Sequence, residues 1–320
     1  MDRREFLTKS SAASLLACFP ASLAGIERTF EPGKLERRAL GRTGERLSLI
    51  GFGGIVVKDA TPEQASARVA EAIDHGVNYF DVAPTYGDAQ DKLGPALEPY
   101  RKGVFLACKT TERSRAGSQR ELDESLRKLR TDHVDLYQLH AVNTREDVDR
   151  LFAADGALET LVAARKAGKV RFLGFSAHTV EAALALIGRF DFDTILFPTN
   201  FAAWHAGSFG PQVLAAARAK QMGILALKAM AKGPWPQGAT RDKYPKCWYE
   251  PLADPADARM GLRFTLSHPV TAAVPPGDEN LFKMALGLGL RFSPLSDAEV
   301  ASIKKRAMAT APLFTYPAWA

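Results

Sequence analysis

The chain has 320 residues, of which 46% are hydrophobic and 24% are charged, and its formal net charge is +6. This composition is typical of a soluble globular protein with a sizeable core. Acidic and basic residues are interleaved, and the short basic runs at residues 127–130 and 304–306 fall in helical patterns beside acidic residues. These runs indicate solvated helix faces, so the composition argues against a nucleic-acid-binding protein.

The first residues of the chain are typical of an export signal. Residues 2–9 contain the pair Arg3 and Arg4 and resemble a twin-arginine motif. The apolar segment at residues 12–23 is too short to span a bilayer comfortably and ends in a small-residue cleavage pattern. We therefore expect the twin-arginine export machinery to recognise a signal peptide, residues 1–24 to be removed, and the mature protein to be periplasmic or otherwise exported.

Two other interpretations of this segment remain open. The first is a merely basic terminus that carries no address. The second is acylation of Cys18, because residues 15–18 form an imperfect lipoprotein box; the protein would then be tethered to a membrane without a stable membrane span. The remaining cysteines, Cys108 and Cys247, are too few for a disulfide framework, and Cys108 is expected to pack in the core, on the face of its strand opposite Lys109.

After the signal, residues 25–34 are expected to form a linker and residues 35–320 a single domain. The domain begins with a predicted hairpin, in which residues 35–40 and 45–50 are the two arms, leading into a first strand. Seven further strands are predicted at residues 77–80, 104–109, 133–140, 170–176, 194–200, 223–228 and 270–274. Helices are predicted at residues 61–75, 88–100, 118–130, 155–167, 180–190, 211–220, 257–267 and 279–290, and an extra C-terminal helix from Asp297. Eight strand–helix units without a reversal predict a parallel sheet closed into a (β/α)8 TIM barrel.

Three successive strand ends carry side chains of complementary chemistry. Asp81 ends the strand at residues 77–80 and Tyr86 follows in the next loop, while Lys109 and His140 end the next two strands. A phenol with a pKa of about 10 is a poor acid at neutral pH, but an ammonium held by a carboxylate can lower that pKa. Each residue also has an ordinary structural explanation, such as a loop cap, a pocket aromatic, an ion pair or a core histidine. Together they predict a catalytic group.

At these positions the sequence resembles the aldo-keto reductase family. The resemblance covers residues 35 to 286 and is carried by Phe-Asp-Val-Ala-Pro-Thr-Tyr-Gly at residues 80–87 and Leu-Tyr-Gln-Leu-His at residues 136–140. It implies a (β/α)8 barrel that uses NADPH and an Asp, Tyr, Lys and His tetrad. Tyr86 would be the general acid, Lys109 would favour its phenolate, and a neutral His140 would hold the carbonyl oxygen; Asp81 would hold the lysine.

The expected cofactor is NADPH, with NADH as an alternative. Residues 51–54 lack the spacing of a Rossmann fingerprint, so the resemblance implies that the dinucleotide lies across the barrel mouth. Ser176 matches the serine that family members direct at the nicotinamide carboxamide. The further candidates for cofactor binding are Gly54, Asn200, Lys228, Met230 and Gly277.

Several positions depart from the family pattern. Ala177 replaces an asparagine, Leu196 replaces a glutamine, and Leu227 replaces the aromatic residue that stacks on nicotinamide. The last cofactor motif is shortened to residues 274–280, where Asp278 would repel the 2′-phosphate of NADPH. Either Lys228 or Lys232 supplies the missing charge, or the preference shifts to NADH, or dinucleotide binding is weak.

The long irregular stretch at residues 232–254 predicts a lid or substrate-pocket loop, or else a surface insertion packed on its own aromatic side chains. An apolar sugar face or an aromatic aldehyde would suit a mouth lined by four aromatic residues, Phe201, Trp204, Trp235 and Trp248. Such an aromatic cluster is as often just loop packing. No metal site is expected, because the six histidines are scattered, and His178 and His205 are expected to face substrate or solvent.

The sequence therefore predicts an NAD(P)H-dependent oxidoreductase that interconverts a carbonyl compound (an aldehyde, ketone or sugar) and an alcohol. Two alternatives stay open. One is a non-catalytic sensor or partner subunit that binds a dinucleotide or another ligand on the same fold. The other is a closed-cycle dismutase or epimerase that retains its cofactor, because soluble nicotinamide cofactors are not expected outside the cytoplasm.

Overall fold

The structure is a computed structural model that describes residues 28–29 and 31–319. The predicted signal peptide at residues 1–24, with Cys18, lies outside the described residues. Among the residues that are described, no helix has the length and apolar character needed to cross a membrane.

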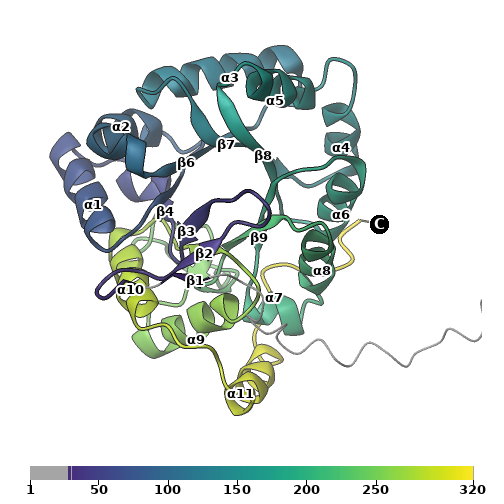
Figure 1. Ribbon diagram of the computed structural model, residues 1–320. Helices are drawn as coiled ribbons and strands as arrows, with labels where there is room; N and C mark the ends of the chain where they lie inside the picture. Colours follow the sequence, from purple (N-terminus) through teal and green to yellow (C-terminus); the bar gives the residue numbers. More distant parts are fainter. Residues whose placement is uncertain (1–27, 30, 320) are drawn as a thin grey trace, which may run out of the picture.

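Eight parallel strands form the centre of the domain (Figure 1). They are neighbours in chain order, from β4 to β13, with β11 and β12 in a separate small sheet. A parallel bridge between Ile50 and Ala273 joins the segment before β4 to β13, and the amide of Gly51 donates to the carbonyl of Ala273 at 2.9 Å. The sheet is therefore a barrel, and the predicted (β/α)8 fold is confirmed. The strands are β4 Phe52–Gly53, β5 Tyr79–Asp81, β6 Phe105–Thr110, β7 Val134–Val142, β8 Val170–Ala177, β9 Thr194–Pro198, β10 Gly223–Leu227 and β13 Ala272–Val274.

Helices surround the barrel (Figure 1). Most follow the predicted ranges, and α10 has the predicted bounds. Two short helices, α4 and α7, were not predicted, and the helix expected at residues 88–100 ends early, in a 3-10 turn (η2) containing Pro99, which has no N–H to donate. The helices are η1 Gly54–Val57, α1 Pro62–Asp74, α2 Ala89–Leu97, η2 Glu98–Gly103, α3 Arg115–Lys128, α4 Arg145–Leu151, α5 Ala157–Lys166, α6 Val180–Arg189, α7 Phe201–His205, α8 Pro211–Ala219, α9 Pro255–Leu266, α10 Glu279–Leu290 and α11 Asp297–Ala307.

The strands are buried on both faces, so they divide the core into two layers. On β6, Phe105 and Ala107 belong to the cluster inside the barrel, whereas Leu106 and Cys108 belong to the cluster between strands and helices. Lys109 continues the inward alternation at the carboxyl end of β6. The prediction that Cys108 packs in the core, away from Lys109, is therefore confirmed.

A three-stranded antiparallel sheet lies across one end of the barrel, in front in Figure 1. It consists of β1 Arg28–Thr29, β2 Arg37–Ala39 and β3 Arg46–Ser48, of which β2 and β3 form the predicted hairpin. The strand β1 corrects part of the expected linker, because backbone pairing with β2 holds these two residues in the sheet. Leu40 and Leu47 join the cluster inside the barrel, so the hairpin closes its floor.

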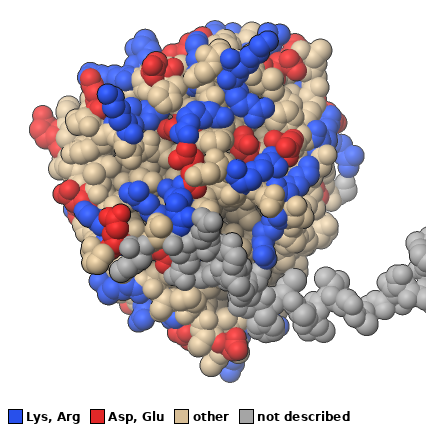
Figure 2. Space-filling view, viewed as in Figure 1, with Lys and Arg blue, Asp and Glu red and all other residues tan. Residues whose placement is uncertain are grey.

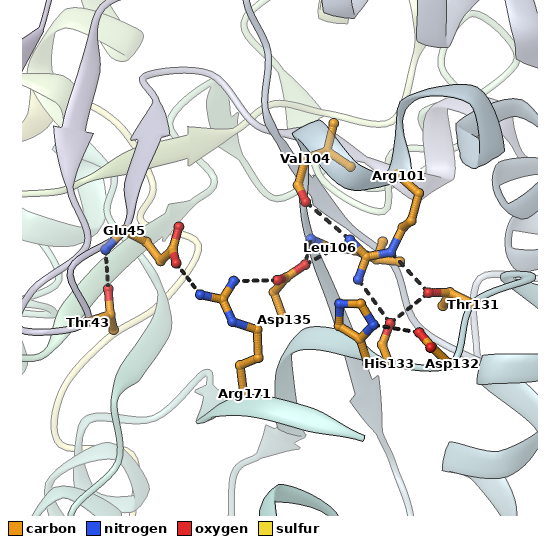
Figure 3. A network of polar contacts seen from close by, with 10 residues as sticks. All are labelled: Thr43, Glu45, Arg101, Val104, Leu106, Thr131, Asp132, His133, Asp135 and Arg171. Atoms are coloured by element: carbon orange, nitrogen blue, oxygen red, sulfur yellow. Dashed lines mark hydrogen bonds and ion pairs between the residues drawn. The ribbon is translucent and has the colours of Figure 1, made fainter. Parts of the chain in front are cut away.

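Beside this hairpin, a network around Asp135 joins strands at the barrel floor (Figure 3). Asp135 is 3% exposed; its Oδ1 accepts from Arg171 at 2.7 Å, and its Oδ2 accepts from the amide of Leu106 at 2.8 Å and pairs with Arg101 at 3.1 Å. Arg171 also pairs with Glu45 of the hairpin turn. A cavity of about 480 Å³ lies here, but its two arginines are already bound to the carboxylates. The network therefore stabilises the floor.

The surface mixes charges of both signs. Figure 2 shows basic side chains beside acidic ones on the hairpin face. The basic runs noted in the sequence are paired in the same manner: Lys128 lies 3.0 Å from Glu124, and Arg306 lies 2.7 Å from Asp257. The prediction of solvated helix faces agrees with these pairs.

Candidate active site

Asp81, Lys109 and Tyr86 meet at the carboxyl ends of β5 and β6. Asp81 and Lys109 are buried, and the Lys109 ammonium forms an ion pair with Oδ2 of Asp81. The same ammonium lies 3.4 Å from the Tyr86 hydroxyl and 3.4 Å from the carbonyl of Val82. Gln138 donates from Nε2 to Oδ1 of Asp81 at 3.1 Å. Both oxygens of the carboxylate are thus engaged, and the ammonium is held beside the phenol.

The charges of this group decide its protonation at neutral pH. Burial alone would lower the pKa of Lys109, but Asp81 and then Tyr86 raise it, and the net pKa is raised. Burial raises the pKa of Tyr86, and the nearby Lys109 opposes this without cancelling it. The sequence predicted a lowered phenol pKa, so the net direction is the reverse. Tyr86 therefore remains protonated and can donate a proton, while Lys109 reduces the cost of the phenolate.

His140 lies next to Tyr86 and is uncharged. The two rings meet edge to face, with centroids 5.9 Å apart and planes at 84°. Burial, followed by the charge of Lys109, lowers the pKa of His140 to about 2. Its buried Nδ1 has no hydrogen-bond partner among the described residues. A neutral imidazole beside a phenol provides a second hydrogen-bond donor for one bound oxygen atom.

An irregularity in β7 sets the direction of His140. The register with β8 shifts between Leu139 and Val142, and Ala141 has a left-handed φ of 51°. Ser176 of β8 accepts from the amide of Ala141 at 2.8 Å. Arg113 donates to the carbonyl of His140 at 2.9 Å. Such bulges redirect side chains next to functional sites, and these two contacts fix the bulge here.

A cavity of about 200 Å³ opens beside these side chains. Its wall contains Asp81, Tyr86 and His140 from the first half of the barrel. The wall also contains two glycines, two lysines and two aromatic residues. These are Gly53, Gly277, Lys228, Lys246, Trp248 and Tyr249, of which all but Gly53 come from the second half of the barrel sequence. The cavity therefore combines a proton donor, a neutral imidazole and positive charge.

A family model agrees with this geometry. The model of the aldo/keto reductase family matches residues 49–250, which include Asp81, Tyr86, Lys109 and His140. The chain belongs to the aldo/keto reductase family. Its cavity lies at the carboxyl ends of the barrel strands, where barrels of this architecture gather their chemistry.

Curated relatives and solved structures are similar to this chain. L-galactose dehydrogenase of Arabidopsis thaliana is 31% identical over 167 residues, covering 46% of this chain and 50% of that protein. The 6-dehydroglucose reductase of Novosphingobium aromaticivorans is 32% identical over 169 residues, covering 47% and 54%. The chain thus spans about half the length of these curated relatives. An aldo-keto reductase from Klebsiella pneumoniae in complex with NADPH has a TM-score of 0.65 over 87% of this chain and 96% of that chain; at 20% identity this likeness shows the fold.

The cofactor candidates of this aldo/keto reductase divide into two groups. Lys228 and Gly277 line the cavity. At Gly277 a Cβ would meet Ile55 at 2.3 Å, so the chain passes close to η1 there. The other candidates are buried and do not line the cavity: Gly54, Ser176, Asn200 and Met230.

Asn200 is the clearest difference from expectation. Its Oδ1 accepts from the amides of Ala202 and Ala203 at the start of α7. Its Nδ2 donates to the carbonyl of Ala231 at 2.6 Å and to that of Lys228 at 3.2 Å. The amide is therefore engaged by the chain itself, because it caps a helix that the sequence did not predict.

Lys246, Trp248 and Tyr249 of the segment after β10 line the cavity, in agreement with a pocket loop. This segment begins with β11 Ala231–Gly233 and ends with β12 Glu250–Pro251, which pair with each other. Between them, Lys246 reaches across the mouth and donates to the carbonyl of Lys58 at 2.6 Å and that of Ile55 at 3.3 Å. Lys232 instead pairs with Glu250 at 2.7 Å at the surface and does not line the cavity.

Three of the four aromatic residues predicted at the mouth are elsewhere. Trp248 lines the cavity, but Phe201 is 1% exposed and packs on Phe264 of α9. Trp204 contacts His268, with centroids 4.2 Å apart, and the indole of Trp235 donates to a backbone carbonyl of the loop. Phe201, Trp204 and Trp235 therefore follow the alternative interpretation, in which the aromatic residues pack within the protein. The unexpected helix α7 turns the first two toward α9.

The histidines expected near the mouth also divide. His178 lines the cavity and stacks on Phe314, whereas His205 packs on Phe264 away from it. No group of three or more His, Cys, Asp or Glu residues within the described part of the chain could hold a metal ion.

Two residues at the site were not predicted. Gln138 stands two positions before His140 on the same strand face, so strand alternation could have identified it. Lys246 had no such signal, because nothing in an irregular segment shows where it returns across the barrel.

Proposed function

We propose that this chain is an NAD(P)H-dependent oxidoreductase that interconverts a carbonyl group and an alcohol, with Tyr86 as the general acid and base. The observation that carries the proposal is the buried Lys109, held by Asp81 with its ammonium 3.4 Å from the Tyr86 hydroxyl. A buried lysine beside a phenol is not needed for a barrel to fold, but its charge favours the phenolate and so assists proton transfer from the phenol.

The residues divide the reaction between them. NAD(P)H, when bound, would supply the hydride for the carbonyl carbon. Tyr86 donates its proton to the carbonyl oxygen, so the products are the alcohol and NAD(P)+. Lys109 stabilises the phenolate that remains until solvent returns the proton. His140, neutral because its pKa is about 2, donates a hydrogen bond to the same oxygen and orients it.

The site residues suit a dinucleotide. Lys246 and Lys228 bring positive charge to the cavity, and this charge favours a ligand that carries phosphates. We propose NADPH as the cofactor, with NADH as the alternative. The Klebsiella pneumoniae structure described as an NADPH complex supports this choice. Asp278 does not line the cavity; its Oδ1 caps α10 by accepting from the amides of Asn280 and Leu281.

The test is Tyr86→Phe. With NADPH and a panel of aldehydes, ketones and sugars, the variant should lose about a thousandfold or more of kcat while its Kd for NADPH stays within about threefold of the wild type. Sugars belong in the panel because two relatives are named for sugar substrates, L-galactose and 6-dehydroglucose. If wild type and variant bind NADPH equally and neither turns over any carbonyl, the non-catalytic sensor is the better description.

We also propose that the protein is a twin-arginine-exported member of the family, found in the periplasm or otherwise outside the cytoplasm. The support is the pair Arg3 and Arg4 before a short apolar segment. Residues 1–34 fused to a folded reporter should be exported, and replacing both arginines by lysine should stop export. Replacing Cys18 by serine tests the lipid-anchored variant of this proposal, since an anchored protein would then leave the membrane fraction.

Export makes the closed-cycle enzyme a second candidate. Lys246 ties the loop over the cavity to η1 through three backbone carbonyls, which favours slow release of a bound dinucleotide. A folded enzyme could then be exported with its cofactor and would reoxidise or reduce it in place with a second carbonyl–alcohol pair. Ultraviolet absorbance of the purified protein decides this: a nicotinamide signal that survives dialysis supports the closed cycle, and a dinucleotide-free protein contradicts it.

A further inference from the structure

Lys228 is a cavity lysine that forms no ion pair among the described residues. It lines the wall, yet no carboxylate among the described residues lies within ion-pair distance of it. Its ammonium instead faces two rings, 5.0 Å from the centroid of Trp248 and 4.8 Å from that of Tyr249. Aromatic faces attract a cation but leave its hydrogen-bond donors free.

The backbone at Lys228 is held in an unusual conformation. Its φ is 66°, in the left-handed region that favours glycine. The carbonyl of Lys228 is fixed by the amide of Ala231 at 2.9 Å and by Nδ2 of Asn200 at 3.2 Å. A glycine would adopt this conformation without strain. The presence of a lysine here therefore indicates a role for its side chain in the cavity.

The other charged groups of the cavity already have partners. Asp81 is paired with Lys109, and the Lys246 ammonium is bound to backbone carbonyls on the side of η1 and Gly277. Lys228 lines the same cavity as His140 and His178, and its charge contributes to lowering the pKa of both imidazoles. The ammonium of Lys228 and the imidazole that would hold the carbonyl oxygen therefore share one cavity.

We propose that Lys228 binds a carboxylate carried by the carbonyl substrate, so that the enzyme prefers aldehydes or ketones that are also acids. This inference rests on the proposed function. One bound anion would neutralise the ammonium, and the rings of Trp248 and Tyr249 would shield the pair from water. A charge-assisted hydrogen bond in such a setting is stronger than a neutral one, and it discriminates against uncharged analogues.

The test compares each acid with its neutral amide. Succinic semialdehyde is paired with its amide, and 4-carboxybenzaldehyde with 4-carbamoylbenzaldehyde, so that two distances between carbonyl and carboxylate are sampled. The wild type should favour at least one acid by about tenfold or more in kcat/KM. In Lys228→Met that ratio should fall to about one, and Lys228→Arg should retain part of the preference. Lys246→Met is the control for the loss of a lysine from the same cavity: it should change kcat/KM for an acid and its amide by the same factor and so leave their ratio unchanged.

The outcomes separate the sources of the anion. If Lys228→Met weakens NADPH binding about tenfold in a fluorescence titration and the acid-to-amide ratio does not change, Lys228 serves a cofactor phosphate and the inference is overturned. If the wild type reduces acids and amides equally, the inference fails while the proposed function stands. If it reduces none of them and does not bind NADPH, both fail. Inhibition of the wild type by benzoate but not by benzamide supports the inference without any variant.

Discussion

Replacing Asp81 by asparagine removes the charge that neutralises Lys109 and keeps the size of the side chain. Asp81 is 2% exposed and Lys109 is 0% exposed, so water cannot replace the missing carboxylate. Removing one partner of a buried ion pair costs about 3–5 kcal/mol, because the remaining charge is left in a medium of low polarity. We expect the free energy of unfolding of Asp81→Asn to fall by about 3 kcal/mol at pH 7, since lysine can release its proton and so limit the loss.

Urea unfolding at pH 7 and pH 9 measures this effect. In Asp81→Asn, burial is no longer opposed by a carboxylate, so the pKa of Lys109 should fall below its unfolded value. The unfolded state then binds more protons than the folded state between these two pKa values, and stability rises with pH in that window. The loss should therefore be larger at pH 7 than at pH 9. The double variant Asp81→Asn with Lys109→Met lacks both charges and should be more stable than Asp81→Asn alone.

Gln138→Leu is the matched control, because it removes a neutral donor from the same carboxylate at 3.1 Å and keeps both charges. Its cost should be about 1 kcal/mol and should not depend on pH. The reasoning is refuted if Asp81→Asn unfolds at the wild-type urea concentration, or if the double variant is the less stable of the two.

Three further predictions follow from the same site. Burial raises the pKa of Tyr86 and lowers that of His140 to about 2, so kcat for carbonyl reduction should be flat from about pH 6 to 9 and fall above about pH 10. A loss of rate centred between pH 7 and 9 in stopped-flow assays would show a lowered phenol pKa instead. Burial lowers the pKa of Lys228 to about 8, so the preference for acids over amides should decline as the pH rises through 8, measured as a ratio of kcat/KM values. Lys246→Met should release NADPH about tenfold faster than the wild type in a competition experiment, since it cuts the tie to η1.

The fold could be predicted from the sequence because a parallel barrel repeats one local signal. A polar side chain or a turn residue marks the end of each strand in the sequence, and adjacent parallel strands end at the same edge of the sheet. Asp81 and Lys109 therefore had to be neighbours once their strands were recognised. The direction of the His140 ring could not be predicted in this way. It is set by the bulge at Ala141, which has a left-handed φ and contacts Ser176, and strand alternation gives no sign of a bulge.

What could not be predicted depends on packing over long distances in the chain. The net direction of the Tyr86 pKa follows from burial, which exceeds the effect of Lys109 and is visible only when the loop and barrel are assembled. The sequence around Asn200 gives no clear sign of a helix. Its side chain nevertheless caps the five-residue helix α7. Lys246 reaches a carbonyl 188 positions away in the chain, and no local pattern encodes that return.

The two ends of the barrel show why similar buried pairs have different roles. At the floor, Asp135 is bound by Arg101 and Arg171, whose guanidinium groups are themselves held by the hairpin and backbone. At the mouth, Asp81 is bound by one lysine, whose ammonium also faces Val82 and Tyr86. The arginines bind carboxylates and backbone carbonyls and therefore stabilise the floor, whereas a lysine with a donor turned toward a phenol can respond to a change in that phenol's charge. The arrangement that proton transfer needs is therefore at the mouth.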